Sequence, residues 1–425
     1  MRGRAVTTAR VRVPPQPTHL ERLAVVFADP IRLKIVTELF RREMSPSQFF
    51  ETYGGGSLPR VDRHFKRLAQ HGWLRLVRQA TGGRRRGSTE HFYRAPELAI
   101  IDNESWAQLP TSLKAEYSWR TFEQFAERVK EALEAGTFDA RGDRHFTWTP
   151  LVLDKQGRGR VIAAVDSLFA SLLEEQADAR LRMARSGEDP IHVTTGLAAF
   201  DSPNRERNRS GLLLPSLRSQ EEAEAMPFTV RLAKVFGNPL NLKIVTELNL
   251  REMSASEFVQ EYGAARLDDV NRRFKMLAEI GWLTQVREET GGKRRGAREH
   301  FYRATGPAIF GTRSWAQVPD EIRGTYSWRA FGQLAEQVRE AMDAGTFDAS
   351  DDRHHTWTPL VLDQLGWEQV IAAVDGVFHF LPKEEEAAKV RLAESGEDPA
   401  IATVYLAAFE SPAGTSQPLD PLPGF

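Results

Sequence analysis

The sequence has no cysteine among its 425 residues. This absence excludes disulfide bonds and every metal site that depends on cysteine thiolates. No apolar run approaches the ~18 residues that a transmembrane helix needs, so no membrane partner is expected. The first 17 residues are basic and lack an apolar core, which argues against a secretory signal. They are expected to form a disordered tail, or else an arm that contacts phosphates.

Catalytic motifs are lacking as well. The sequence contains no Walker loop, G-x-S-x-G elbow, HExxH motif or dinucleotide fingerprint, so we expect neither an enzyme nor a cofactor. The net charge is only −1, but the charge is unevenly distributed. Residues 57–95 hold ten Arg and Lys against two acids, a balance of +8. Such a local basic segment is typical of phosphate binding.

The chain is a tandem duplication. Five segments recur at a constant offset, since 239 − 30 = 209 and 395 − 186 = 209. They are Phe27–Pro30 with Phe236–Pro239, Leu33–Leu39 with Leu242–Leu248, Glu90–Ala95 with Glu299–Ala304, Trp148–Asp154 with Trp357–Asp363, and Ser186–Pro190 with Ser395–Pro399. The chain is therefore made of two related halves, copy 1 and copy 2.

The duplication and the composition predict seven segments. They are a disordered basic tail (1–18), the amino-terminal module of copy 1 (19–96), the carboxy-terminal module of copy 1 (97–202), a linker (203–227), the amino-terminal module of copy 2 (228–305), the carboxy-terminal module of copy 2 (306–411) and a disordered tail (412–425). The linker and the last segment are rich in charge or proline, which is typical of exposed chain.

The amino-terminal module is expected to be four short helices followed by a hairpin. Apolar spacing predicts helices over 20–27, 31–40, 46–53 and 58–71, with Asp29 and Ser45 or Ser47 as helix caps. A turn at Gly72 leads into a strand, a glycine-flanked tip over 82–87 and a second strand over 91–94. A basic helix followed by a basic hairpin is the layout of a winged helix-turn-helix.

The helix over 58–71 carries the candidate DNA-reading face. Leu58, Val61, Phe65 and Leu68 form an inward apolar stripe. The remaining faces carry the candidate site residues, Arg60, Arg63, His64, Lys66 and Arg67, and copy 2 contributes Arg272, Arg273 and Lys275. A helix of this width fits the major groove, where Arg reads guanine O6 and N7. The alternative is an amphipathic helix with a solvated basic face, and the adjacent basic hairpin favours DNA binding.

Each hairpin tip carries three adjacent cations. They are Arg84, Arg85 and Arg86 in copy 1, and Lys293, Arg294 and Arg295 in copy 2. Their mutual repulsion is relieved beside phosphates or in a narrow minor groove. We therefore predict that these tips are wings that contact the DNA backbone or the minor groove.

The segments Phe27–Val36, Val61–Leu68 and Gly72–Leu74 together resemble the ArsR-type winged helix-turn-helix of bacterial transcription regulators. The resemblance implies that the helix carrying Arg60 and Arg63 enters the major groove while the hairpin lies over the adjacent backbone. It also implies homodimers that often act as repressors. Metal-sensing members use Cys, His and Asp ligands. Because this chain has no cysteine, thiolate sensing is excluded, and no metal site is expected.

The two copies are not equal in charge. Residues 266–304 again hold ten basic residues, but six acids reduce the balance to +4. Asp268 and Asp269 stabilise the helix start against its dipole, yet they repel phosphates there. We predict that the amino-terminal module of copy 1 binds DNA more strongly, while that of copy 2 reads a different half-site or binds a partner.

The carboxy-terminal modules are expected to be α-β-α-β units, with a helix over 117–135, a strand over 148–154, a helix over 161–185 and a strand over 191–200 in copy 1. Their role is either packing between the copies or an effector pocket. The histidines near positions 145 and 354 are expected on surface turns, and burial in a core or interface is expected for Trp106, Trp119, Trp148, Trp315, Trp328 and Trp357.

These features predict a mainly helical α+β protein with two tandem copies of a winged helix-turn-helix, each followed by an α-β-α-β module. The expected function is transcription regulation by binding double-stranded DNA in the cytoplasm, at the nucleoid, with the two copies forming an intramolecular pseudo-dimer. The oligomer is a monomeric pseudo-dimer or a homodimer. Two alternatives remain: a winged-helix protein-interaction module, or a sensor gated by a small-molecule effector.

Overall fold

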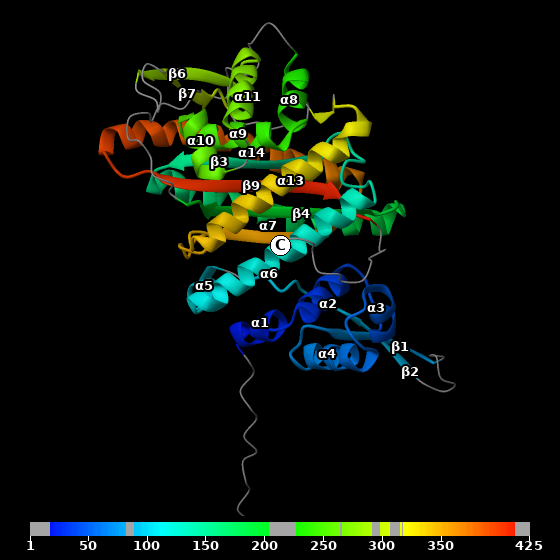
Figure 1. The fold of residues 1–425 in the computed structure, drawn as a ribbon. Helices are drawn as coiled ribbons and strands as arrows, with labels where there is room; N and C mark the ends of the chain where they lie inside the picture. The colour runs from blue at the N-terminus through cyan, green and yellow to red at the C-terminus, as the bar shows by residue number, and fades with distance from the viewer. Residues whose placement is uncertain are drawn as a thin grey trace, which may run out of the picture. The chain divides into compact units, whose positions relative to one another are not determined.

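The computed structural model describes residues 18–81, 89–101, 103–203, 227–263, 266–290, 298–306, 315–316 and 318–412. It confirms a mixed α+β fold that is mostly helical, with 58% helix and 21% strand. The chain divides into two compact units, one ending at Gln108 and the other beginning at Leu109. Unit 1 therefore holds the amino-terminal module of copy 1. Unit 2 holds the carboxy-terminal module of copy 1 from residue 109 onward and both modules of copy 2 (Figure 1).

Unit 1 is a short helical array followed by a two-stranded hairpin. Its elements are α1 (His19–Phe27), α2 (Pro30–Arg41), α3 (Pro46–Tyr53), α4 (Leu58–Gln70), β1 (Arg75–Thr81), β2 (Thr89–Arg94) and α5 (Asn103–Ala107). Side chains fix three of the helix starts: Thr18 and Ser45 form capping boxes, and Asp29 accepts a hydrogen bond from the Ile31 N–H. The helix bounds agree with the expected ones to within three residues.

The core of unit 1 orients α4. Val61, Phe65 and Leu68 of the expected stripe are fully buried, whereas its first member, Leu58, is only half-buried. The Phe65 ring packs edge-on against Phe49 of α3 and Tyr93 of β2, with ring centroids 5.8 and 5.6 Å apart. Burying one stripe leaves the opposite side of the helix in solvent. An isolated bridge between Met44 and Tyr93 adds a strand-like contact that the sequence did not predict.

The amino-terminal module of copy 2 repeats this order inside unit 2. Its elements are α8 (Phe228–Phe236), α9 (Pro239–Leu250), β5 (Met253–Ser254), α10 (Ala255–Tyr262), α11 (Leu267–Glu279), β6 (Leu283–Thr290) and β7 (Arg298–Ala304). The three strands form a sheet in the order β5-β7-β6. Tyr326 of the carboxy-terminal module packs on Phe236 of α8, with ring centroids 6.1 Å apart.

The two carboxy-terminal modules build one sheet together. Copy 1 supplies α6 (Thr111–Glu134), β3 (His145–Leu153), α7 (Lys155–Ser186) and β4 (Ile191–Asp201), and copy 2 supplies α13 (Asp320–Asp343), β8 (His354–Leu362), α14 (Gln364–Ser395) and β9 (Ala400–Glu410). The strand order is β3-β9-β4-β8, and every neighbouring pair is antiparallel. The strands of the two copies therefore alternate, and no strand neighbours another of its own copy (Figure 1).

The two faces of this sheet bury different cores. In β4, Val193 and Leu197 pack in a core shared with α7 and α14, while Ala198 and Phe200 face the core that includes α6 and α13. The period-2 alternation of a strand produces this division. Both central strands are buried along nearly their whole length, which explains their continuous apolar sequences.

Several polar contacts between the copies occur in matched pairs. The Nδ1 atom of His145 lies 2.7 Å from Asp375 Oδ1, and that of His354 lies 2.6 Å from Asp166 Oδ1. Because 354 − 145 and 375 − 166 both equal 209, these are the same contact made in both directions. Such reciprocity is the property of a two-fold interface.

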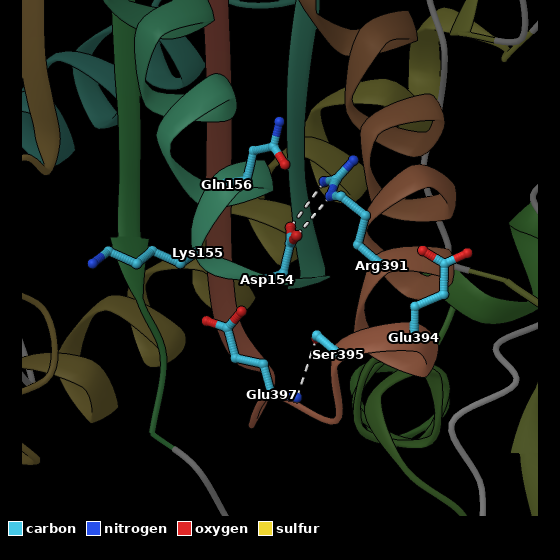
Figure 2. Close-up of a pocket in the computed structure, with 7 residues that line it drawn as sticks. All are labelled: Asp154, Lys155, Gln156, Arg391, Glu394, Ser395 and Glu397. Atoms are coloured by element: carbon cyan, nitrogen blue, oxygen red, sulfur yellow. Dashed lines mark hydrogen bonds and ion pairs between the residues drawn. The ribbon is translucent and has the colours of Figure 1, made fainter.

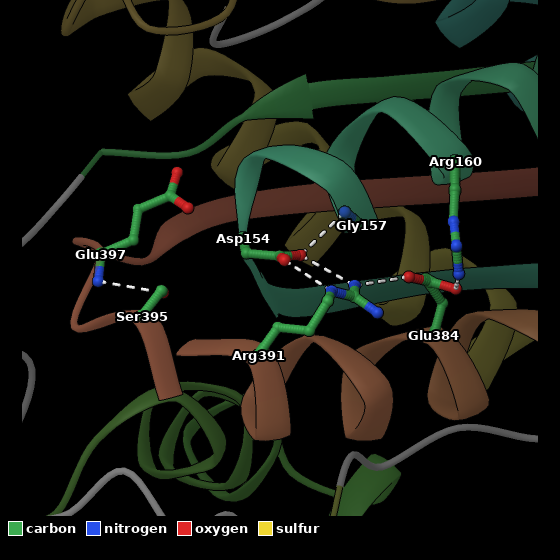
Figure 3. A network of polar contacts seen from close by, with 7 residues as sticks. All are labelled: Asp154, Gly157, Arg160, Glu384, Arg391, Ser395 and Glu397. Atoms are coloured by element: carbon green, nitrogen blue, oxygen red, sulfur yellow. Dashed lines mark hydrogen bonds and ion pairs between the residues drawn. The ribbon is translucent and has the colours of Figure 1, made fainter. Parts of the chain in front are cut away.

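A second matched pair joins the long helices. Arg391 of α14 bonds both carboxylate oxygens of Asp154, at 2.6 and 2.8 Å, and Asp154 also caps α7 (Figure 3). Arg182 of α7 bonds Asp363, the cap of α14, at the same two distances. Each helix start is therefore held by an arginine from the other copy.

Several expectations for the carboxy-terminal module were wrong in detail. Helix α7 begins at Lys155, six residues before the expected start, because Asp154 accepts from the Gly157 N–H at 2.8 Å and offsets the weak helix propensity of the early glycines. Strand β3 begins at His145, where pairing with β9 already starts. Helix α6 begins at Thr111.

The histidine and tryptophan expectations were also partly wrong. His145 and His354 are buried within strands, because each has a carboxylate partner in the other copy. Trp106, Trp148 and Trp315 are buried as expected. Trp328 is 50% exposed, since it follows the buried Ser327 on α13 and lies off the face that packs inward.

Candidate nucleic-acid interface

Helix α4 presents a basic face opposite its buried stripe. Three glycines with positive φ, Gly54, Gly55 and Gly56, make the turn that separates it from α3. At 100° per residue, Arg60, Arg63 and Arg67 fall on one side of the helix, away from Val61 and Phe65. All three arginines are exposed, and so is Lys66 at the edge of this face. The structure thus brings four of the five predicted α4 residues onto the solvent side.

Charge partners near this face are few. Lys66 pairs with Asp62 one turn earlier, Nζ to Oδ2 at 2.7 Å. Arg63 donates from Nε to the Pro59 carbonyl at 3.3 Å, a contact that leaves its charge uncompensated. Within the part of the chain that the structure describes, neither Arg63 nor Arg67 forms an ion pair. Two of the four cations on this face, Arg63 and Arg67, therefore keep charges that no described carboxylate offsets.

His64 takes a different position from the other predicted residues. Its side chain is only 12% exposed, and Nε2 lies 3.6 Å from Oδ2 of Asp29. Arg60 Nη2 approaches the same oxygen at 3.5 Å. Burial lowers the pKa of His64 below its ordinary value, although the Asp29 carboxylate opposes this shift. The lowered pKa favours the neutral imidazole, and the side chain lies near the start of α2 rather than on the exposed basic face.

The hairpin adds exposed cations beside the helix. Arg75 of β1 and Arg94 of β2 are paired across the ladder, and both are exposed. Arg78 stacks on Phe92, with its guanidinium 3.5 Å from the ring centroid, and pairs with Glu43 at 2.6 Å. Neither Arg75 nor Arg94 was among the predicted site residues. The sequence could have indicated them, because pairing the two strands of the hairpin places Arg75 opposite Arg94 at its base.

The predicted wing tips cannot be located. Arg84, Arg85, Arg86, Lys293, Arg294 and Arg295 lie outside the described residues. The antiparallel strands that lead to and from each tip are described, and they pair as far as Thr81 with Thr89 in copy 1 and Thr290 with Arg298 in copy 2.

The equivalent helix of copy 2 has a different charge arrangement. Arg272 and Lys275 are exposed. Asp269 accepts from Arg272 Nη2 at 2.7 Å and from Arg273 Nε at 3.0 Å. Arg273 also donates to Asn241 Oδ1 at 2.8 Å, so its guanidinium is held against α9. Both arginines lower the pKa of Asp269, which keeps its carboxylate charged at neutral pH.

A second candidate site is an open cleft where the two copies meet in unit 2. Its volume is about 640 Å³, and it lies between the start of α7 and the end of α14 (Figure 2). Its lining residues are Asp154, Lys155, Gln156, Arg391, Glu394, Ser395 and Glu397. Asp154 and Arg391 bond each other, which offsets these two charges of the lining.

Two features are absent from the described residues. No group of three or more His, Asp and Glu there could hold a metal ion. No helix among them is both long and apolar enough to cross a bilayer. Comparisons with protein-family models, with curated proteins and with solved structures find no match to this chain.

Proposed function

We propose that this protein is a DNA-binding transcription regulator of the ArsR-like winged-helix type, active in the cytoplasm at the nucleoid. The observation that supports this most is the basic face of α4, with Arg60, Arg63, Lys66 and Arg67 exposed opposite a fully buried stripe. In this proposal α4 enters the major groove and the following hairpin lies along the phosphates. The reaction is binding alone, with no catalytic step and no cofactor.

We propose further that the copies act as an intramolecular pseudo-dimer. The alternating strand order and the reciprocal His–Asp and Arg–Asp contacts support this. In a homodimer a second subunit would make these contacts, and here the other copy in the same chain makes them. A pseudo-dimer reads an imperfect palindrome whose half-sites lie one helical turn, or a multiple of it, apart.

The first test is DNA binding by the full chain with Arg63→Ala. Arg63 is exposed on α4 and forms no ion pair among the described residues, so its loss should leave the fold intact. We expect weaker binding to a mixed-sequence duplex and a salt dependence reduced by about 0.9 in log–log slope, the value for one phosphate contact. If Arg63 reads a base instead, the loss appears as about 1–3 kcal/mol of lost discrimination at one position.

The matched control is Arg185→Ala, which removes an exposed arginine from the end of α7. It changes the net charge equally and should leave DNA binding unchanged. Equal effects of the two substitutions would indicate general electrostatic attraction and contradict the role given to α4. Selection of bound duplexes from a random library by the wild-type chain would supply the operator sequence.

The cleft in Figure 2 favours one alternative, a sensor gated by a small-molecule effector. A ligand there would contact both copies at the Asp154–Arg391 pair and could change how they are held together. A ligand-induced rise in melting temperature would support this alternative. Loss of that rise on Lys155→Ala would locate the ligand in the cleft.

A further inference from the structure

Asp269 occupies the position at which copy 1 has an arginine. The offset of 209 pairs it with Arg60, so the charge at this position in the first turn differs by two units between the two helices. Over their full lengths, α4 carries four Arg and Lys against one acid, or +3, and α11 carries three against three, or zero. The difference lies on the side of the helix that faces away from the core.

The contacts of Asp269 do more than change the total charge. Its two oxygens are divided between Arg272 and Arg273, one bond to each guanidinium. A carboxylate that bonds guanidinium in this way imitates a phosphate oxygen pair. An arginine that is already paired releases no counter-ion from DNA until that pair is broken.

The two arginines differ in how accessible their side chains are to a ligand. The Arg272 side chain is 78% exposed, whereas Arg273 is 23% exposed and is also bonded to Asn241. Breaking the Asp269 contact would therefore free Arg272 for a phosphate while leaving Arg273 held against α9. In copy 1 the only acid on the helix, Asp62, pairs with Lys66 and leaves the arginines alone.

We propose that Asp269 is an internal counter-ion that occupies Arg272 in place of a DNA phosphate and makes α11 the weak partner in DNA binding. This inference rests on the proposed function, because it assigns the unequal roles of the two helices to one residue. It deepens that function by predicting a one-sided footprint, in which α4 makes the strong half-site contacts. Asp269 is thus a specificity-determining residue that sets which copy engages the duplex.

The experiment measures DNA binding by copy 2 in the full chain. A parent variant, Arg60→Ala with Arg63→Ala, weakens the α4 face. Asp269→Asn is then added to release Arg272, or Asp269→Arg to install the copy 1 residue as well. Binding to a duplex of about 40 base pairs is measured by fluorescence anisotropy at several salt concentrations, and the log–log slope counts phosphate contacts at about 0.9 each. Circular dichroism melts confirm that every variant is folded.

The matched control is Glu279→Gln, which removes one acid from the far end of α11 with the same change of net charge. Asp269→Asn should steepen the slope of the parent by about 0.9 and Asp269→Arg by about 1.8, because they add one and two contacts. At 0.1 M salt the affinity should rise at least about fivefold for Asp269→Asn. Glu279→Gln should change the affinity by less than about twofold, since its charge is screened over that distance.

Three results would overturn the inference. The first is that the affinity of the parent depends on salt as steeply as that of the wild-type chain, which would mean that α11 already contacts phosphates. The second is that neither Asp269 variant steepens the log–log slope of the parent. The third is that Glu279→Gln has the same effect as Asp269→Asn, which would mean that general charge explains both. Absence of DNA binding by the wild-type chain at low salt is a separate outcome, which would reject the proposed function itself.

Discussion

Gly196 gives the sharpest test of how the shared sheet is packed. This residue lies in the buried strand β4, directly beneath the Phe125 ring of α6. A Cβ atom added at Gly196 would lie 2.4 Å from Phe125 Cε2 and 2.7 Å from Cζ, well inside van der Waals contact. Phe125 cannot move aside easily, because its ring stacks on Tyr405 at 5.4 Å and also contacts Phe331. Gly196→Ala must therefore displace packed aromatic rings.

The cost follows from two opposing effects. Overpacking a closed core typically costs about 1–3 kcal/mol. Replacing glycine with alanine recovers about 0.4–1 kcal/mol by restricting the unfolded chain. We expect Gly196→Ala to lower the free energy of unfolding by about 1–2 kcal/mol, which lowers the melting temperature by about 2–8 °C at about 2–4 °C per kcal/mol.

The matched control is Gly332→Ala in α13. Gly332 is exposed within a helix, and an added Cβ meets no atom within 4 Å. Alanine is favoured over glycine there by about 0.8–1 kcal/mol, so the control should raise the melting temperature. Opposite signs for the same chemical change would show that the packing around Phe125 decides the result.

A double substitution tests the cause. Copy 2 has Leu334 and Tyr405 at the positions equivalent to Phe125 and Gly196. Adding Phe125→Leu should make Gly196→Ala less costly than it is in the wild-type chain, a coupling of at least about 0.5 kcal/mol. Thermal and urea unfolding, followed by circular dichroism, measure all four proteins. An unchanged or higher melting temperature for Gly196→Ala would refute the reasoning.

Three further predictions concern polar groups. Arg144→Ala removes the buried partner of Asp139, which it bonds at 2.7 Å, and should cost about 3–5 kcal/mol in urea unfolding, because the acid is left unpaired. The pKa values of Asp154 and Asp363 are lowered mainly by their bonded arginines. The stability that these carboxylates contribute is therefore complete above their unfolded pKa of about 3.9 and is lost as pH falls through the lower folded pKa. In melts between pH 6 and about 2, the Asp154→Asn and Asp363→Asn chains should each lose less stability on acidification than the wild-type chain, because each lacks one of the two titrating carboxylates. Trp73→Phe loses the 2.8 Å bond from Nε1 to the Arg22 carbonyl and should destabilise unit 1 by about 1–3 kcal/mol, measured by urea unfolding.

Local structure was largely predictable from the sequence. The inward stripe of Val61, Phe65 and Leu68 follows from helical spacing, and all three are buried. The Asp29 and Ser45 caps also follow from local chemistry, because a capping side chain bonds an N–H only two or three residues away. Interactions of this range are contained in a short stretch of sequence.

Arrangements between distant segments were not predictable in this way. The nearly continuous apolar sequence of β4 indicates two buried faces, but it does not say that β9 is the neighbouring strand. His145 was placed on a surface turn because its partner, Asp375, lies 230 residues away in the sequence. The excess of acids in α11 was visible in the sequence, whereas the division of Asp269 between two arginines needed the positions of the side chains.

The strand order explains why the two copies keep some features and lose others. Because β9 lies between β3 and β4, the carboxy-terminal module of copy 1 has no continuous sheet without copy 2, and the reverse holds for β8 and β9. Each residue at this interface faces the other copy, so a change in one copy must suit both, and the His–Asp and Arg–Asp pairs occur twice. The exposed faces of α4 and α11 contact no such partner among the described residues. The arginine at position 60 and the aspartate at the equivalent position 269 can therefore differ without disturbing the sheet.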